Sequence, residues 1–328
     1  MHATKPGEPM LLRPAGKDYL WGGTRLKTEY NKEIDMEPLA ETWECSVHPD
    51  GPSRIVTGRY KGWTLDKVLQ ERPEFMGTKV DHNSGFPVLM KFIDAAGDLS
   101  VQVHPDDEYA REHEHQNGKT EMWYVMDARP GAKLVCGFAH DVTEEQLRRG
   151  VEEGDLSKHL QKVDVYKGDV FFIPAGTVHA IGAGILIAEI QENSNLTYRV
   201  YDYDRVDRNG KKRELHFDKA MEVLNRKAGA DVRQKPRIMH YYPGCSRELL
   251  CRCKYFETER IQMVREFSFS VLQTSFQVLL CLEGSGSVEV EGEDPEKILF
   301  SKGDCIFLPA GLGRCHVAGK AAMLKVRC

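Results

Sequence analysis

The chain has 328 residues, of which 41% are hydrophobic, and it carries a formal net charge of −5. This length suggests two domains, since a domain averages roughly 150 residues. The small negative charge argues against a nucleic-acid partner, because phosphate backbones are held by clustered lysine and arginine side chains.

Short apolar runs separated by glycine and proline make up most of the chain. Such runs at short intervals favour a β-sandwich or barrel. In chain order, the expected strands cover residues 53–56, 88–93, 99–103, 122–125, 170–173 and 185–190.

Three helices are expected among these strands. The first covers residues 64–70. The second opens at Thr143, which has the capping-box spacing to Gln146. The third covers residues 217–226 and places its apolar residues on one face.

A ten-residue pattern occurs twice. The segment KGDVFFIPAG at residues 167–176 recurs as KGDCIFLPAG at residues 302–311. In each copy, a Lys-Gly-Asp turn leads into an apolar strand that stops at Pro-Ala-Gly, since glycine allows the positive φ of such turns and proline ends a ladder. Two copies of one β module are therefore expected. The first has its core at about 85–200 within an amino-terminal part, 1–235, that ends in a helical linker, and the second lies in 236–328.

The cysteines and the amino terminus bear on the cellular compartment. Nine cysteines, an odd number, show no dense disulfide framework, and the first residues have no apolar signal core. With no apolar run near the ~20 residues of a membrane span, we expect a cytoplasmic protein with free thiols and no membrane partner. Cys251 and Cys253 form a C-x-C pair without a second pair at metal spacing, and we interpret them as packing thiols.

One basic cluster lies in the expected linker. It surrounds an Asn-Gly turn, and we interpret it as a solvated loop because charge runs usually are. Its members are Arg205, Arg208, Lys211, Lys212 and Arg213.

Four residues have the chemistry of a metal site. Gln102 and His104 stand two apart in an expected strand and so face the same side. Glu121 precedes the apolar run 122–125, and His179 follows the first Pro-Ala-Gly turn. Two imidazoles, a carboxylate and an amide oxygen suit zinc, which keeps an open position at catalytic sites. The sequence therefore predicts one zinc ion per chain held by these four side chains.

The prediction depends on the combination, because a lone histidine in a strand is more often structural. The repeat provides a control. The position equivalent to His179 in the second copy is Arg314, although His316 lies close by. One copy is thus equipped for metal and the other is not.

The residues also show a family resemblance. The segment KFIDAAGDLSVQVHPDD at residues 91–107 resembles the signature of the type I mannose-6-phosphate isomerases in their short bacterial form. The resemblance runs in register from about residue 10 to 225, and the rest matches mainly through a degenerate second cupin. Other matching segments are residues 21–23, 41–43, 118–121, 174–179, 198–205 and 213–216.

The resemblance implies a mainly β fold of two cupin-like, jelly-roll β-barrel modules with a few short helices, the second module lacking a metal site. It implies the same four zinc ligands and places Arg199, Lys119 and Lys91 in the active site. The implied substrate is a small sugar phosphate, with interconversion of mannose 6-phosphate and fructose 6-phosphate. Both a monomer and a homodimer fit the sequence.

An aldose–ketose isomerase needs a base and a stabiliser of developing negative charge. Zinc is a Lewis acid for the sugar oxygens, and Arg199 adds fixed positive charge. A divalent ion disfavours the ammonium form of a neighbouring lysine, which favours Lys119 for proton transfer. Lys91 then binds the phosphate or orients the open-chain sugar.

One position departs from the family pattern. Many relatives carry an acidic residue after the serine of the Ser-x-x-x-x-Arg segment, where this chain has Asn195 after Ser194. The identity of the general base is therefore open. Two other functions of the protein are also open. A cupin dioxygenase would use the two histidines and the glutamate for iron, and a non-catalytic cupin would only bind a sugar phosphate.

Overall fold

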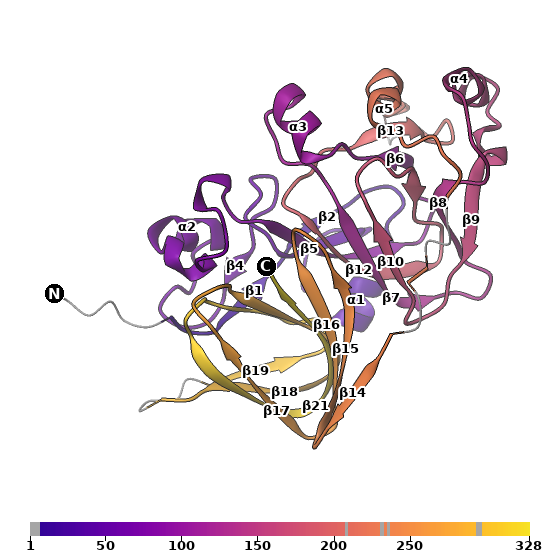
Figure 1. The fold of residues 1–328 in the computed structure, drawn as a ribbon. Helices are drawn as coiled ribbons and strands as arrows, with labels where there is room; N and C mark the ends of the chain where they lie inside the picture. Colours follow the sequence, from indigo (N-terminus) through magenta and orange to yellow (C-terminus); the bar gives the residue numbers. More distant parts are fainter. Residues whose placement is uncertain (1–6, 207–208, 230–232, 235–236, 293–296) are drawn as a thin grey trace.

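The computed structural model describes residues 7–206, 209–229, 233–234, 237–292 and 297–328. Its strands form three sheets of ten, six and five strands, and short helices connect them (Figure 1). The expectation of a mainly β protein with a few short helices is confirmed. The ladders among the described residues leave each sheet with free edges, so the sheets are open rather than closed barrels.

The six-stranded sheet forms the centre of the molecule. Its antiparallel order is β10-β7-β12-β5-β3-β2. Every residue of β3, β5 and β12 is buried, as expected for a sheet that is covered on both faces. The strands are β2 (Ala15–Lys17), β3 (Glu41–Cys45), β5 (Val88–Ala95), β7 (Glu121–Ala128), β10 (Val170–Ile173) and β12 (Ile185–Glu192).

The five-stranded sheet packs on one face of the six-stranded sheet. Its order is β13-β6-β11-β8-β9. In the core between the two sheets, Ile93, Trp123 and Ile187 of the larger sheet join Leu134 and Cys136 of the smaller one. The strands are β6 (Val101–Val103), β8 (Lys133–Phe138), β9 (Leu160–Asp164), β11 (His179–Ala180) and β13 (Tyr198–Tyr201).

The ten-stranded sheet contains the carboxyl-terminal half. Its order is β14-β15-β16-β21-β18-β20-β1-β4, with β17 on β21 and β19 on β18. The strands are β1 (Met10–Arg13), β4 (Arg54–Ile55), β14 (Met239–Tyr242), β15 (Cys245–Arg252), β16 (Glu257–Met263), β17 (Glu266–Val271), β18 (Gln277–Val290), β19 (Lys297–Ser301), β20 (Cys305–Leu308) and β21 (Gly313–Arg327).

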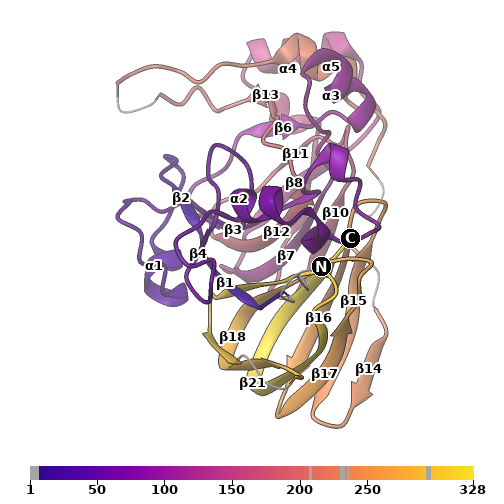
Figure 2. The same cartoon turned by 90° about the vertical axis from the view of Figure 1, so that its left-hand side faces the viewer.

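The two halves share one hydrophobic core. Phe92 and Met122 from the outer face of the six-stranded sheet pack with Val278 and Phe307 of the ten-stranded sheet. Leu279, the neighbour of Val278, belongs to a separate core inside the carboxyl-terminal half, because successive strand residues face opposite sides. In both views, the orange and yellow strands of this half lie together beneath the rest of the chain (Figures 1 and 2).

The strand order of the carboxyl-terminal sheet repeats that of the other two sheets. The series β20-β18-β21-β16-β15-β14 corresponds to β10-β7-β12-β5-β3-β2, and β17-β21-β18-β19 corresponds to β6-β11-β8-β9. In the second series, β18 and β21 have 14 and 15 residues and run through both layers. One continuous sheet therefore takes the place of the two separate ones.

The helices are short and lie between strands. The α-helices are α1 (Arg25–Tyr30), α2 (Leu65–Glu71), α3 (Asp107–His113), α4 (Glu144–Glu152) and α5 (Phe217–Val223), and the 3-10 helices are η1 (Pro73–Met76), η2 (His82–Ser84) and η3 (Leu156–Lys158). Among the described residues, no helix has the length and apolar character needed to cross a bilayer.

The expected elements are found, with shifted ends. The capping box at α4 is present, because Thr143 Oγ1 accepts from Gln146 N at 3.2 Å and Gln146 Oε1 accepts from Thr143 N at 2.8 Å. Helix α5 ends three residues before the predicted residue 226, since Leu224 has an extended backbone. The expected strand at 99–103 is shorter, as β6 begins only at Val101.

The thiols are free, as predicted. All nine cysteines are unpaired, and seven of them are buried. Cys251 lies within β15, whereas Cys253 lies just beyond its end, in the turn to β16. The two cysteines of the C-x-C pair therefore do not lie in the same strand.

Candidate metal centre

The four predicted ligands come from strand ends that meet between the two amino-terminal sheets. Gln102 lies in β6, and His104 is the first residue after this strand. His179 begins β11 and is the cross-strand partner of Gln102. Glu121 begins β7 in the opposite sheet. Strand β6 is short because proline follows His104 and cannot donate to a ladder.

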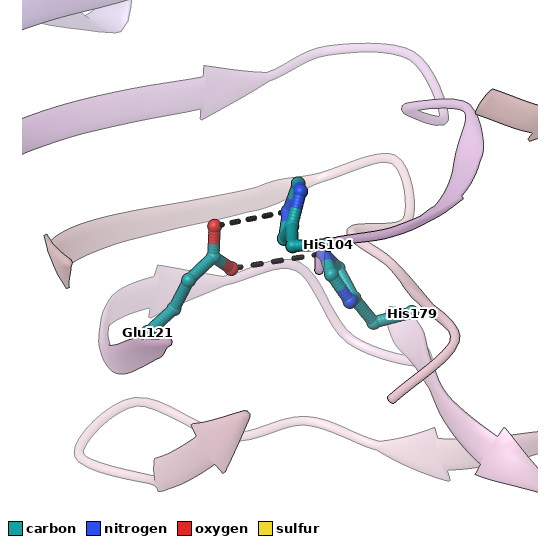
Figure 3. A group of neighbouring side chains, drawn as sticks. All are labelled: His104, Glu121 and His179. Carbon is teal, nitrogen blue, oxygen red and sulfur yellow. Dashed lines mark ion pairs between the residues drawn. The ribbon is translucent and has the colours of Figure 1, made fainter. Parts of the chain in front are cut away.

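Three of these side chains converge on one point. Glu121 Oε1 lies 3.2 Å from His104 Nε2, and Glu121 Oε2 lies 3.7 Å from His179 Nε2 (Figure 3). All three side chains are at most 1% exposed. One ligand atom from each lies within 4.8 Å of the others, a spacing that could hold a metal ion.

Backbone carbonyls orient both imidazoles. His104 Nδ1 lies 2.8 Å from Leu196 O, and His179 Nδ1 lies 2.8 Å from Thr177 O. A carbonyl can only accept, so each Nδ1 carries the proton and each Nε2 lone pair points at Glu121. Burial lowers the pKa of both imidazoles, to about 3 for His104. Neutral imidazoles with a free Nε2 and a fixed Nδ1–H are the form that binds metals.

The carboxylate of Glu121 fits a cation centre. Burial alone would raise its pKa, but Lys119, His104 and His179 hold it well below the ordinary value. Glu121 is thus ionised, yet neither of its buried oxygens accepts a hydrogen bond of normal geometry. A buried carboxylate is stabilised by nearby positive charge. Lys119 supplies one such charge, and a divalent cation among the two Nε2 atoms and this carboxylate would add to it. The residues present therefore fit a metal ion.

Lys119 supplies a positive charge at this point. Its Nζ lies 2.5 Å from Glu121 Oε1 and 3.2 Å from His104 Nε2, and the residue is only 4% exposed. The ammonium group thus lies within reach of two of the predicted ligands. Lys119 also lines the neighbouring cavity.

Gln102 is placed at the edge of the cluster. Its Nε2 lies 3.4 Å from His179 Nε2. A half-turn of the amide presents Oε1 at the same position, since the two ends of the group have nearly the same shape. All four predicted ligands are therefore gathered in one place.

A cavity of about 250 Å³ opens beside the cluster. Its wall contains the predicted residues Lys91, Lys119 and Arg199, together with Gln102. Other polar lining residues are Tyr19, Glu41, Ser100, Glu189, Asn195, Thr197 and Arg213. The cavity is thus a polar chamber rich in cations, suited to a small anionic ligand.

Lys91 is a buried cation held by two carboxylates. Its Nζ lies 3.3 Å from Glu189 Oε1 and 3.8 Å from Glu41 Oε2. Burial alone would lower the pKa of Lys91, but Glu41 and Glu189 raise it above the ordinary value. The carboxylates are held in turn by indole N–H groups, Glu189 by Trp123 at 2.9 Å and Glu41 by Trp43 at 2.8 Å. Lys91 is therefore a fixed positive charge rather than a base.

Two arginines form the outer wall of the cavity. Arg199 donates from Nη1 to Glu214 O at 2.8 Å and from Nε to Ser100 Oγ at 3.3 Å. Burial and the adjacent Arg213 lower the pKa of Arg199. Arg213 is held by two hydrogen bonds to Asp202, at 2.8 and 2.5 Å. The pair concentrates positive charge at the cavity mouth.

Asn195, where the chain departs from the family pattern, lies between two hollows. It lines both the cavity and a wider depression next to it. Its Nδ2 donates to Asp50 Oδ2 at 3.1 Å. The amide thus contacts a carboxylate on the opposite loop, a contact that two carboxylates would not make at neutral pH.

Sequence reasoning missed three charged residues of the cavity. Glu189 and Glu41 were not assigned roles, although Glu189 is a single charge inside the apolar run 185–190, which is a usable signal. Arg213 was interpreted as part of a solvated loop, but it faces the cavity. Another member of that cluster, Arg208, lies outside the described residues.

Two packed sheets with a buried His-Glu-His cluster and a polar chamber define the class of this protein: a cupin-family fold with a candidate divalent-cation centre. Residues 10–139 match the family described as phosphomannose isomerase type I, catalytic domain. Residues 247–328 match the family described as mannose-6-phosphate isomerase, cupin domain.

Full-length relatives agree. The chain is 38% identical over 316 residues to mannose-6-phosphate isomerase ManA of Bacillus subtilis, which covers 96% of this chain and 97% of that protein. A mannose-6-phosphate isomerase of Streptococcus mutans is 39% identical over 304 residues, 92% of each. The crystal structure of the mannose 6-phosphate isomerase from Bacillus subtilis matches with a TM-score of 0.89 at 34% identity, over 98% of this chain and 99% of that one. The chain belongs to the type I phosphomannose isomerase family and is an isomerase.

Proposed function

We propose that this protein is a zinc-dependent isomerase that interconverts mannose 6-phosphate and fructose 6-phosphate. One observation carries the proposal: an ionised carboxylate that accepts no hydrogen bond of normal geometry from the described residues converges with two imidazole Nε2 atoms beside a chamber rich in cations. The relatives named above for this reaction support the choice of substrate. All nine thiols are free, which supports an enzyme of the cytoplasm.

His104, Glu121, His179 and Gln102 would hold the ion. When bound, it supplies Lewis-acid stabilisation of negative charge on the sugar oxygens. The neutral state of both imidazoles and the ionised state of Glu121 leave the site ready for a cation at neutral pH.

Lys119 has the geometry of the proton carrier. The reaction removes a proton from C2 of the open-chain aldose and returns one to C1 through an enediol. In its amine form, which a bound divalent ion would favour, Lys119 would take the proton from C2, become ammonium and return the proton at C1. The hydroxyl proton of O2 passes to O1 in the same conversion, so that protons balance over the cycle. Lys91 remains an ammonium group between Glu41 and Glu189 and orients the open-chain sugar.

Arg199 and Arg213 are the natural partners for a phosphate. A guanidinium matches phosphate geometry and keeps its charge throughout the pH range of the reaction. Ser100 and Thr197 line the same wall and offer hydroxyl donors. A sugar phosphate then spans the chamber, with its carbonyl end at the cluster and its anion at the arginines.

We further propose that the protein consists of two cupin modules, with a boundary near residue 235, and that only the first holds metal. The repeated strand order supports this. In the first module Gln102 pairs with His179, and at the corresponding place in the second Ser270 pairs with Arg314. Gln277 begins β18 as Glu121 begins β7. These three counterparts include no imidazole, thiolate or carboxylate, which are the side chains that usually bind zinc.

A coupled assay on mannose 6-phosphate, with and without chelator, tests the function. The purified protein should form fructose 6-phosphate, lose this activity with chelator and regain it with zinc. Oxygen uptake is measured in parallel, because a cupin dioxygenase consumes oxygen and an isomerase does not. A protein that binds the sugar phosphate but never converts it would overturn the proposal.

A further inference from the structure

A pair of carboxyl groups lies behind the short segment at residues 118–120, which contains Lys119. Asp107 begins helix α3, three residues after His104. Glu192 ends strand β12, three residues after Glu189. The two side chains are hydrogen-bonded to each other. In the described structure, neither residue lines the cavity, and neither belongs to the His104-Glu121-His179 cluster.

Each of the two carboxyl groups holds one backbone N–H of the segment. Gly118 N donates to Asp107 Oδ1 at 3.1 Å, and Thr120 N donates to Glu192 Oε2 at 2.7 Å. Between them, Lys119 N donates to Pro105 O at 3.0 Å. Three consecutive amides are thus anchored to groups that flank the metal ligands, and Glu121 follows immediately.

The close packing requires glycine at position 118. A Cβ on Gly118 would lie 2.4 Å from backbone atoms of Asp106 and Asp107, too close for any side chain. The segment therefore lies directly against the start of α3, and its position depends on the groups that hold it there.

The carboxyl pair shares one proton. Burial, together with the neighbouring Asp107, raises the pKa of Glu192 to about 8. Burial would also raise the pKa of Asp107, but the Gly118 N–H and Arg111 bring it below the ordinary value. At neutral pH, Glu192 is thus the acid that donates and Asp107 the carboxylate that accepts.

The second half of the chain reaches this pair. In the turn between β15 and β16, Tyr255 OH donates to Asp107 Oδ2 at 3.4 Å, and Lys254 Nζ lies 3.5 Å from the same oxygen. Arg111 Nη2 lies 3.3 Å from it on the helix side. Asp107 is therefore held from both halves of the molecule.

We propose that Asp107 and Glu192 are positioning residues. They hold the backbone of Gly118 and Thr120 and so fix the positions of Lys119 and Glu121 beside His104 and His179. The inference rests on the proposed function for its kinetic consequence only. Its structural content, the anchoring of this segment, can be tested on the protein without any substrate.

The matched variants are Glu192→Gln and Glu192→Ala. Glutamine keeps an acceptor for Thr120 N and a donor for Asp107, as the protonated acid does, whereas alanine removes both. We expect Glu192→Ala to lower kcat by about 10- to 100-fold, the range seen when groups behind metal ligands are lost. KM should change much less, because the phosphate-binding wall is untouched. Glu192→Gln should stay close to the wild type. Glu112→Ala, a change on the exposed face of α3, is the control.

Amide hydrogen exchange of the peptide that contains residues 118–120 supplies the second readout. Glu192→Ala should exchange faster there and bind zinc more weakly, while Glu192→Gln and Glu112→Ala match the wild type. If exchange and zinc affinity are unchanged in a folded Glu192→Ala protein, the positioning role is wrong. If they change as expected but no variant isomerises the sugar, the proposed function fails and the positioning role stands.

Asp107→Asn and Asp107→Ala form the second matched set. Asparagine can still accept from Gly118 N, and its amide can donate to Glu192 when Glu192 is ionised. It should therefore retain more of the activity than alanine, although it lacks the charge that faces Arg111 and Lys254. Equal losses in the two variants, at equal thermal stability, would contradict the role assigned to Asp107.

Discussion

Lys91 and Glu259 occupy the same place in the two halves of the molecule and carry opposite charges. Lys91 in β5 is the ladder partner of Glu189 in β12, and Glu259 in β16 is the ladder partner of Lys325 in β21. Each also has a second partner of opposite charge one strand further on: Glu41 in the first half and Arg247 in the second. The three-residue network is present twice, with every sign inverted.

The two networks differ in whether the central charge can still bind a ligand. In the second half, Glu259 lies 2.8 Å from Lys325 Nζ and 2.7 Å from Arg247 Nη2, so its charge is fully compensated within the chain. In the first half, Lys91 lies at longer distances from its partners and lines the cavity. We therefore expect Lys91 to bind the ligand, and Glu259 at the corresponding position to have a structural role only.

The pair Lys91→Met and Lys325→Met tests this difference. Lys91→Met should raise KM for the sugar phosphate by about tenfold or more, because a charge-assisted hydrogen bond contributes roughly 1.5–3 kcal/mol. Lys325→Met should lower the thermal midpoint and leave kcat/KM and zinc content unchanged. Steady-state kinetics and thermal unfolding on both variants provide the measurement. A loss of zinc in Lys325→Met would mean that the second half contributes to the metal site after all.

Removal of either imidazole should release the metal. For His104→Ala and His179→Ala we expect zinc affinity to fall by roughly 100-fold or more, since even groups behind the ligands contribute 10- to 100-fold. Elemental analysis and competition with a chromophoric chelator measure the loss, and activity should fall in parallel. His113→Ala, which removes an exposed imidazole, is the control. Full zinc occupancy in either ligand variant would exclude that residue from the ligand set.

Lys119→Met separates proton transfer from metal binding. Turnover should fall by roughly 100- to 10,000-fold, the usual contribution of general acid–base catalysis, with zinc content near one per chain. Without Lys119, the Glu121 charge has lost its nearest partner in the metal-free protein. Zinc should therefore raise the thermal midpoint of this variant more than that of the wild type, as differential scanning fluorimetry can show. Near-normal turnover would remove Lys119 from the mechanism.

The proton shared by Asp107 and Glu192 predicts a pH dependence of stability. The pKa of Glu192 is raised from 4.5 to about 8 in the folded protein. Between these values the folded state keeps a proton that the unfolded state has lost, so this contribution is complete below about pH 4.5 and is lost as the pH rises through 8. The free energy of unfolding should fall by at most about 1.4 kcal/mol per pH unit in this window. Urea unfolding at several pH values measures the slope, and it should disappear in Glu192→Gln.

A buried lysine of an ion pair also links the two halves, through a hydrogen bond to a backbone carbonyl of the second half. Lys32 Nζ lies 2.6 Å from Glu44 Oε2 and donates to Gly303 O at 2.5 Å, with both side chains at most 6% exposed. Lys32→Met should lower the free energy of unfolding by roughly 3–5 kcal/mol, because, among the described residues, the buried Glu44 carboxylate is then left without a cation and with only the Thr42 hydroxyl as a hydrogen-bond donor. Lys158→Met, which breaks an exposed pair with Asp155, should cost at most about 1 kcal/mol. Chemical denaturation compares the two, and equal effects would contradict the argument.

The His104-Glu121-His179 cluster could be predicted from the sequence, because the directions of side chains along a strand follow from their spacing in the sequence. A two-residue spacing placed Gln102 and His104 on one face, and the repeat located the turn before His179. The ion pairs of Lys91 could not be predicted from the sequence. A charged residue inside an apolar run must have a partner of opposite charge, but the sequence does not show which residue that partner is. Glu189 and Glu41 reach Lys91 from strands on either side, a relation that only the sheet order gives.

The sequence predicted a mainly β fold with a few short helices, but it did not predict how the strands are divided among the three sheets. The repeat at 167–176 and 302–311 became β10 and β20, which hold corresponding positions. The run of β18 and β21 through two layers was not visible, because each contains two apolar segments that look like separate strands. The bulge in β18 between Cys281 and Glu283 lets one strand turn from one layer into the next.

The pairing of β1 with β20 joins two segments that are far apart in the sequence. Met10 is in register with Phe307, so β1 leaves the ribosome long before the strand with which it pairs. Until β20 has been synthesised, one edge of β1 is unpaired and invites association with other chains. Growth conditions that slow translation should therefore favour aggregation of this protein over accumulation of a partly working enzyme.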